Sequence, residues 1–253
     1  MAARSRVNFD LSTKSLMNLK CLLPAVAVSY GLSTVVNSAL AQNWTQTSAP
    51  RMNWTSVASS ADGSKLVAVA GPIYTSIDSG VTWNLSSAPS NHWVLVGSST
   101  DGTKLVAAAN AVNSPYTGPI YCSTDSGATW SLSSVPSNHW SSVASSADGT
   151  KWVAVVFGGS IYSSTDSGAT WAQSSAPTQY WSCVASSADG GKWVAVSGAA
   201  NVWGSIYISI DAGETWMSNS LPSERWVSVA CSADASKLVA MPFEGPTLFT
   251  SAN

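Results

Sequence analysis

The chain has 253 residues, of which 45% are hydrophobic and only 9% are charged, and its formal net charge is −2 at pH 7. This length and apolar content suffice for one domain with a sizeable core, and they exclude an intrinsically disordered protein. So small a basic content also excludes the electrostatic footprint of a nucleic-acid-binding protein.

The first 41 residues differ from the rest and predict an exported protein. A basic start at Lys20 is followed by an apolar run from Cys21 to Val36 and by the small-residue ending Ala39-Leu40-Ala41. This order is that of a secretory signal peptide cleaved after Ala41, with Met17 as a possible true start. A membrane anchor is the alternative, but Pro24 and several polar residues interrupt the run. We expect a secreted protein, periplasmic or extracellular, that has no stable membrane insertion after cleavage.

An eight-residue motif, which we call the box, recurs four times in residues 42–253. It reads Ser-x-Asp-x-Gly-x-Thr-Trp and occupies 76–83, 123–130, 164–171 and 209–216. The pattern predicts a tight turn between antiparallel strands, because the Asp carboxylate can accept backbone N–H groups and Gly can take a positive φ. The aspartates are therefore expected to be structural: Asp78, Asp125, Asp166 and Asp211.

The box resembles the Asp-box, or BNR repeat, of sialidase-like β-propellers. The resemblance covers nearly all of residues 42–253 and implies an all-β β-propeller of four-stranded antiparallel blades. Sialidases hold the substrate carboxylate with three arginines, whereas only Arg51 and Arg225 follow residue 41 here. The sialidase active site therefore cannot be formed, and the resemblance extends to the scaffold alone.

A second landmark predicts a hairpin in each of five repeats, which begin at Trp54, Trp93, Trp140, Trp181 and Trp226. Eight residues after each Trp stands an Asp, followed three residues later by a Lys. Asp-Gly between two apolar runs is a hairpin signal, so strand A holds the Trp and strand B is Leu-Val-Ala-Val or a close variant. Strand C is Ile-Tyr in four repeats, and strand D runs from the box Trp to a proline, which suits an outer edge.

The two ends of the repeat region are expected to complete one blade. The repeats open with a lone strand D at 43–50 and stop at a strand C around Phe249. Residues 42–253 hold five repeats of about 42 residues each, so we expect five blades in a monomeric ring whose last blade is closed by the N-terminal strand. Sialidases have six blades and photosystem-assembly propellers seven. The alternatives are a fragment of a larger ring and a chain that closes by associating with another copy.

Three cysteines follow residue 41, and their odd number argues against a disulfide framework. Cys122, Cys183 and Cys231 are expected to be small buried thiols in strands. A bridge between Cys183 and Cys231, which lie in successive repeats, is the alternative.

Ligand-specific residues are expected where the repeat is broken. From residue 42 onward, two Arg and five Lys stand against nine Asp and three Glu, a net charge of −5 that disfavours nucleic acid and anionic membrane. The D–A and B–C loops should emerge on one rim, opposite the boxes. The residue before each strand-A Trp varies, and with two B–C loop aromatics these are the predicted ligand-binding residues: Asn53, His92, His139, Tyr180, Arg225, Tyr116 and Trp203.

Such a rim suits a glycan or a protein ligand. The plainer interpretation is a tolerant polar loop position, with Trp203 folded back onto its blade. Two histidines without a third ligand do not predict a metal site, and no cofactor is predicted.

Glu224 and Glu244 are the only candidate catalytic pair. A glycoside hydrolase needs two carboxylates flanking the bond, and both glutamates are expected on the rim of the fifth repeat. Two solvated loop glutamates are the more common situation. We therefore expect a non-catalytic binding or interaction module, with a glycoside hydrolase and a structural assembly factor similar to the photosystem-assembly propellers as alternatives.

The exported protein is predicted to begin at Gln42, because the small-x-small sequence at 39–41 ends the apolar segment. N-terminal sequencing of secreted material tests this. A first residue at or before Met17 would contradict it.

Overall fold

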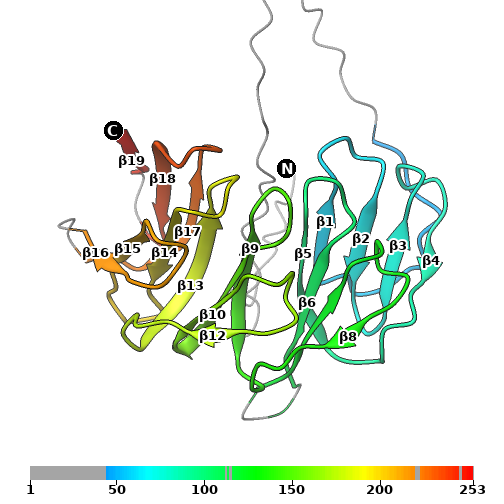
Figure 1. Ribbon diagram of the computed structural model, residues 1–253, viewed down its shortest axis with the longest axis horizontal. Coiled ribbons are helices and arrows are strands. Elements are labelled where there is room, and N and C mark those ends of the chain that lie inside the picture. The colour runs from blue at the N-terminus through cyan, green and yellow to red at the C-terminus, as the bar shows by residue number, and fades with distance from the viewer. Residues whose placement is uncertain (1–43, 112, 114–115, 220–222, 245–246, 253) are drawn as a thin grey trace, which may run out of the picture.

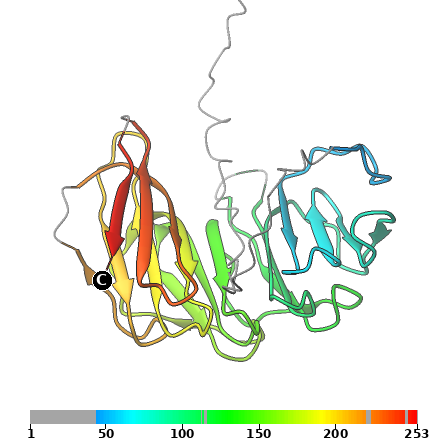
Figure 2. The ribbon, with the colours of Figure 1, turned by 90° about the horizontal axis from the view of Figure 1, so that it is seen from above.

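The computed structural model describes residues 44–111, 113, 116–219, 223–244 and 247–252, so the predicted signal peptide lies outside it. The described chain is all β. It contains no helix long and apolar enough to span a membrane. The five repeats form five antiparallel blades, which follow one another along an arc (Figures 1 and 2).

Blades 1 to 4 each contain strands A to D in order, and blade 5 contains three strands among the described residues. Blade 1 comprises β1 (Ser56–Ser59), β2 (Leu66–Val69), β3 (Ile73–Ser76) and β4 (Asn84–Leu85). Blade 2 comprises β5 (Trp93–Ser98), β6 (Leu105–Ala109), β7 (Ile120–Ser123) and β8 (Ser131–Leu132). Blade 3 comprises β9 (Trp140–Ser145), β10 (Trp152–Gly159), β11 (Ile161–Ser164) and β12 (Ala172–Gln173). Blade 4 comprises β13 (Gln179–Ser186), β14 (Trp193–Ser197), β15 (Ile206–Ser209) and β16 (Met217–Ser218). Blade 5 comprises β17 (Trp226–Cys231), β18 (Lys237–Pro242) and β19 (Phe249–Ala252).

Strands A, B and C lie where the sequence predicts them, but strand D is shorter. In blade 1, β4 pairs with β3 through two residues only and does not extend to the proline. Directly after it, the hydroxyl of Ser87 donates to the carbonyl oxygen of Ala128, in the box of blade 2, at 2.7 Å. The chain leaves the sheet early because it makes this contact with the next blade.

The boxes form closed hydrogen-bonded turns. In blade 2, the Asp125 carboxylate accepts the Ser123 hydroxyl at 2.8 Å, and the N–H and hydroxyl of Thr129 at 2.9 and 2.6 Å. Gly127 has a φ of 85°, which favours glycine at this position. The Trp130 indole N–H then donates to the Gly127 carbonyl oxygen at 3.0 Å. The other three boxes have the same arrangement around Asp78, Asp166 and Asp211.

The core lies between neighbouring blades rather than inside them. At the junction of blades 3 and 4, Val153, Val155 and Ile161 pack against Trp181 and Trp193, and all five side chains are buried. Equivalent clusters fill the other three junctions. Each junction therefore joins the apolar Val-x-Val face of one blade, or Val-x-Ala in blade 2, to the large aromatic or aliphatic side chains of the next.

The A–B hairpins join the blades at the end that also carries the boxes. Backbone N–H groups donate from one hairpin to the next, as from Thr100 to the Ala147 carbonyl oxygen at 2.8 Å. The Lys104 ammonium also donates to the Asp148 carbonyl oxygen at 2.8 Å. A Cβ at Gly149, where φ is 63°, would lie 2.6 Å from the Ser99 Cβ, so these hairpins approach closely enough to require glycine.

Closure of the ring is a second point where the fold differs from the expectation. Among the described residues, β19 pairs with β18 alone, and 44–50 belong to no strand. The Trp44 side chain is 95% exposed, whereas the four box tryptophans are half-buried. Blades 1 and 5 lie at opposite ends of the arc (Figure 2) because the packed side chains at the four junctions do not turn the chain through a full circle.

Two of the three cysteines, Cys122 and Cys231, are the free thiols that the sequence predicts, whereas Cys183 is disulfide-bonded and the expectation of a thiol there is wrong. The alternative bridge between Cys183 and Cys231 is not formed, because Cys231 is a free thiol. Burial raises the pKa of Cys231 to about 11, with a further rise from the nearby Asp234 carboxylate. Cys122 is also a free thiol, and burial raises its pKa as well.

We predict that acid destabilises the fold between about pH 4 and pH 2. Hydrogen bonds from the Ser146 hydroxyl and the Thr150 N–H lower the pKa of Asp148 to about 2, and all nine described aspartates have lowered pKa values. A depressed native pKa contributes stability above the unfolded value of about 4, and this stability is lost as the pH falls through the native value. Melting temperature measured from pH 7 to pH 2 should stay level to about pH 5 and then fall. A level profile down to pH 2 would contradict the prediction.

Candidate functional site

Four aromatic rings touch one another in sequence along the rim formed by the D–A and B–C loops. Tyr116 lies 6.0 Å from His139, His139 lies 5.4 Å from Phe157, and Phe157 lies 5.1 Å from Tyr180, measured between ring centroids. We call these four residues the aromatic strip. The two tyrosines at its ends are exposed, and the two central rings are half-buried. The strip therefore crosses from blade 2 to blade 4 and offers ring surface to solvent.

An extension of strand B in blade 3 positions the strip. β10 continues past its partner β9 and pairs with β13 of the next blade, with Phe157 opposite Tyr180. This pairing joins blades 3 and 4 into one sheet. The Tyr180 carbonyl oxygen also accepts the Gly198 N–H at 2.8 Å.

His139 is anchored from two sides. Its carbonyl oxygen accepts the Phe157 N–H at 2.9 Å. The next residue, Trp140, exchanges hydrogen bonds with the Asn110 side chain, each 3.1 Å long. Burial lowers the pKa of His139, so the imidazole is neutral at pH 7 and acts in the strip as an aromatic ring rather than a cation.

Arg225 forms a second group on the rim, in blade 5. Its guanidinium carbon lies 4.4 Å from the centroid of the Phe243 ring, and Nη1 lies 3.2 Å from the Glu244 carboxylate. The Phe243 N–H donates to the Arg225 carbonyl oxygen at 2.7 Å, which holds the two residues together. The Arg225 side chain is largely buried and is oriented by both neighbours.

Trp203 projects from the rim beside this second group. Its side chain is 63% exposed. A short turn precedes it, in which Ala199 and Val202 exchange backbone hydrogen bonds and Asn201 has a φ of 65°. The following residue, Gly204, exchanges backbone hydrogen bonds with Glu224 at 2.8 and 3.1 Å. Trp203 is thus held on a fixed backbone rather than folded back onto its blade.

The remaining predicted rim residues lie outside these groups. His92 is exposed, and its Nδ1 lies 3.1 Å from the Asn110 carbonyl oxygen. Asn53 is exposed on blade 1, at the far end of the arc. Among the described residues, the ring contacts of the strip include neither of them.

Phe157 and Phe243 take part in the two rim groups, although neither is among the ligand-binding residues predicted from the sequence. Both stand in B–C loop positions that the repeat does not define. A large aromatic residue in such a loop is the signal that points to both, as it does to Tyr116 and Trp203.

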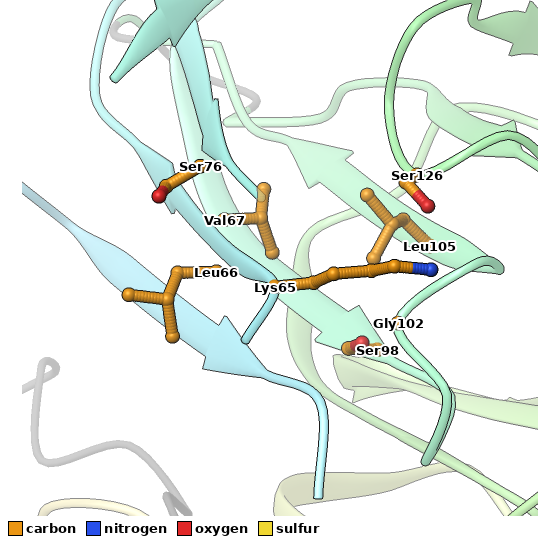
Figure 3. A pocket seen from close by; sticks show the side chains of 8 residues that line it. All are labelled: Lys65, Leu66, Val67, Ser76, Ser98, Gly102, Leu105 and Ser126. Carbon is orange, nitrogen blue, oxygen red and sulfur yellow. The ribbon is translucent and has the colours of Figure 1, made fainter. Parts of the chain in front are cut away.

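Two cavities in the described part of the chain lie away from the rim. One lies between blades 1 and 2, where Lys65, Leu66 and Leu105 contribute to its lining (Figure 3). It encloses about 10 Å³, the space of a single water. The other is an apolar hollow on blade 5, described below. The described residues also contain no group of three His, Cys, Asp or Glu side chains able to hold a metal ion.

Comparison with solved structures establishes the architecture. The chain is similar to a GH74 enzyme of Niastella koreensis, with a TM-score of 0.63 and 18% identity over 79% of this chain and 30% of that one. It is similar to the GH74 xyloglucanase from Xanthomonas campestris, with a TM-score of 0.59 and 17% identity over 79% and 37% of the two chains. For YCF48 bound to D1 peptide, the TM-score is 0.54, with 19% identity over 78% and 64%. The chain has the β-propeller fold.

These likenesses extend to the fold alone, because every sequence identity is below 20%. This chain spans about a third of the length of each GH74 protein and just under two thirds of YCF48. No family model and no curated protein matches its sequence.

We predict that Trp203→Ala leaves the propeller nearly as stable as before, with a loss below about 0.5 kcal/mol, because its side chain is exposed. Asp125→Ala removes three hydrogen bonds from a box and should cost about 1–3 kcal/mol. Urea unfolding of both variants measures the difference. If Trp203→Ala destabilises the protein as much as Asp125→Ala, Trp203 is a packing residue and not a contact residue.

Proposed function

We propose that this propeller is a non-catalytic module that binds carbohydrate on its rim, with the aromatic strip as the principal contact. The ring-to-ring series from Tyr116 to Tyr180 carries the proposal. Tyrosine side chains offer rigid, amphipathic contact area at low entropic cost, and their phenolic hydroxyl groups can hydrogen-bond a polar ligand.

The second rim group extends this surface toward blade 5. Trp203 supplies an exposed indole, and Arg225 supplies a guanidinium already oriented by Phe243 and Glu244. Trp, Tyr and Arg are the residue types most enriched among energetically dominant contacts. A chain of several sugar units, rather than one monosaccharide, would reach from the strip to this group.

Binding is favoured over hydrolysis by the ion pair of one of the two candidate glutamates. Glu244 is engaged with Arg225, and Glu224 is bound through its backbone to Gly204. A glycoside hydrolase requires two carboxylates facing each other across the scissile bond. The contact with Arg225 draws Glu244 into an ion pair instead.

The proposal places this module outside the cytoplasm, where extended glycans occur and where the predicted signal peptide would direct it. The likeness to GH74 proteins supports a carbohydrate ligand only as an analogy of fold. The likeness to YCF48 bound to D1 peptide supports a peptide ligand on the same terms, which makes peptide binding the competing outcome.

The test is calorimetric titration of the purified protein with xyloglucan and cellulose oligosaccharides and with a panel of unstructured peptides. Tyr116→Ala and Tyr180→Ala should each weaken oligosaccharide binding by about 1–2 kcal/mol, or about 5- to 30-fold in Kd. Ile210→Ala is the matched control, since Ile210 is 63% exposed but lies in a box on the opposite end of blade 4. Its affinity should equal that of the unaltered protein.

Three results would overturn the proposal. The first is binding of peptides and of no oligosaccharide. The second is oligosaccharide binding that both tyrosine variants retain in full. The third is release of new reducing ends from xyloglucan that Glu224→Gln and Glu244→Gln abolish, which would indicate a hydrolase.

A further inference from the structure

The same packing recurs at all four junctions between blades, and it has two distinct sides. The leading face of a blade, which meets the next blade, presents Val-x-Val of strand B (Val-x-Ala in blade 2) and Ile of strand C. The trailing face, which meets the preceding blade, presents the strand-A Trp and the strand-C aromatic in edge-to-face contact. Blade 4 illustrates both, with Val194, Val196 and Ile206 on its leading face and Trp181 and Tyr207 on its trailing face.

Within the part of the chain that the structure describes, no neighbouring blade covers the leading face of blade 5. Val239 and Met241, at the Val-x-Val positions, are only half-buried, whereas the equivalent residues of the other blades are fully buried. Leu248, at the Ile position, is 62% exposed, whereas Ile73, Ile120, Ile161 and Ile206 are at most 5% exposed. Val239 and Thr250 are directly paired across β18 and β19, so they share a face, and both contribute to the lining of an apolar hollow.

The trailing face of blade 1 likewise has no neighbouring blade among those of residues 44–252 that the structure describes. Trp54 and Tyr74 already form the edge-to-face pair, at 5.7 Å between centroids, as at the four packed junctions. Trp54 is nevertheless only half-buried, while the other four strand-A tryptophans are at most 2% exposed. Both halves of a fifth junction are therefore formed, but they lie at opposite ends of the arc (Figure 2).

The segment 44–50 also lies where a strand D of a preceding blade would lie. The Ser48 hydroxyl donates to the Val81 carbonyl oxygen, in the box of blade 1, at 2.6 Å. The residues at the same distance from a box Trp make the same contact with the next box, from Ser87 to Ala128 and from Ser175 to Glu214. The segment is thus docked on blade 1 without a strand C beside it.

The register of the missing pairing follows from the other blades. In blade 1, Tyr74 pairs with Leu85 and Thr75 with Asn84, and the Ser86 N–H donates to the Ile73 carbonyl oxygen. Moved to β19, the same register places Phe249 opposite Gln46 and Thr250 opposite Thr45. It also directs the N–H of Thr45 toward β19.

We propose that the leading face of blade 5 binds a second copy of this chain. That copy packs its Trp54 face against Val239, Met241 and Leu248, and it adds residues 45–46 to the free edge of β19. A second copy fits because it carries the partner surface already used at four junctions of the molecule. The contact is head-to-tail, so each copy keeps one free face, and association continues until a ring closes or a linear chain grows.

The inference does not depend on the bound ligand, and two variants of the full chain test it from opposite ends. Leu248→Asp places a charge on the leading face, and Thr45→Pro removes an N–H that the pairing with β19 would use. Sedimentation velocity of the unaltered protein should show concentration-dependent association. Each variant alone should be monomeric with an unchanged melting temperature, because neither residue is buried in the single chain.

The control is Leu132→Asp. Leu132 is also 62% exposed, but it lies on the strand D edge of blade 2, away from both end faces. This variant should associate like the unaltered protein.

Mixing the two monomeric variants distinguishes a second copy from closure within one chain. Leu248→Asp retains a working N-terminal end, and Thr45→Pro retains a working β19 edge, so the mixture should form a 1:1 dimer that grows no further. An unaltered protein that is monomeric at every concentration, or a mixture that forms no dimer, would overturn the proposal. The first of these results, together with loss of stability in Thr45→Pro, would indicate closure within the chain.

Discussion

The packing of one tryptophan per blade against the preceding blade is the interaction on which the structure depends. A strand of four to six residues cannot bury enough surface within its own sheet, so the apolar area lost from water lies between sheets. The tryptophans at 93, 140, 181 and 226 are almost completely buried there, each in edge-to-face contact with a strand-C aromatic. Each blade is stable only with neighbours, which is the energetic pattern of repeat proteins.

The two ends of the blades have different chemistry. At the box end, side chains form hydrogen bonds within the turns and between neighbouring hairpins. The Asp148 carboxylate accepts the Ser146 hydroxyl, and the Lys104 ammonium donates to the Asp148 carbonyl oxygen. At the rim, the repeated hydrogen bonds join backbone groups, as from the Phe157 N–H to the His139 carbonyl oxygen and from the Gly198 N–H to the Tyr180 carbonyl oxygen, so the side chains can differ from blade to blade. Sequence freedom at the rim follows from its small role in stability, which is why a binding surface can be built there without weakening the scaffold.

The candidate site shows how a small change in a strand creates a local surface. β10 is longer than the other B strands of blades 1 to 4, and its extension reaches β13 of the next blade. That pairing brings Phe157 beside Tyr180 and His139, three residues from different loops of the sequence. The aromatic strip is therefore a consequence of strand pairing across blades, and neither residue spacing nor composition contains it.

The local periodicity of the sequence was enough to predict the β-propeller, the hairpin turns and the box turns. Each box completes its hydrogen bonds within eight residues, so its structure depends on contacts between near neighbours. Strand D was predicted too long. Its end is set by the hydrogen bond from the Ser87 hydroxyl to Ala128 of the next blade, and these two residues are 41 positions apart in the sequence. The tertiary structure alone decided the angle between blades, which leaves β19 and 44–50 apart. That angle is set by the sum of four packed junctions, and a small difference at each one decides whether the ends of the arc meet.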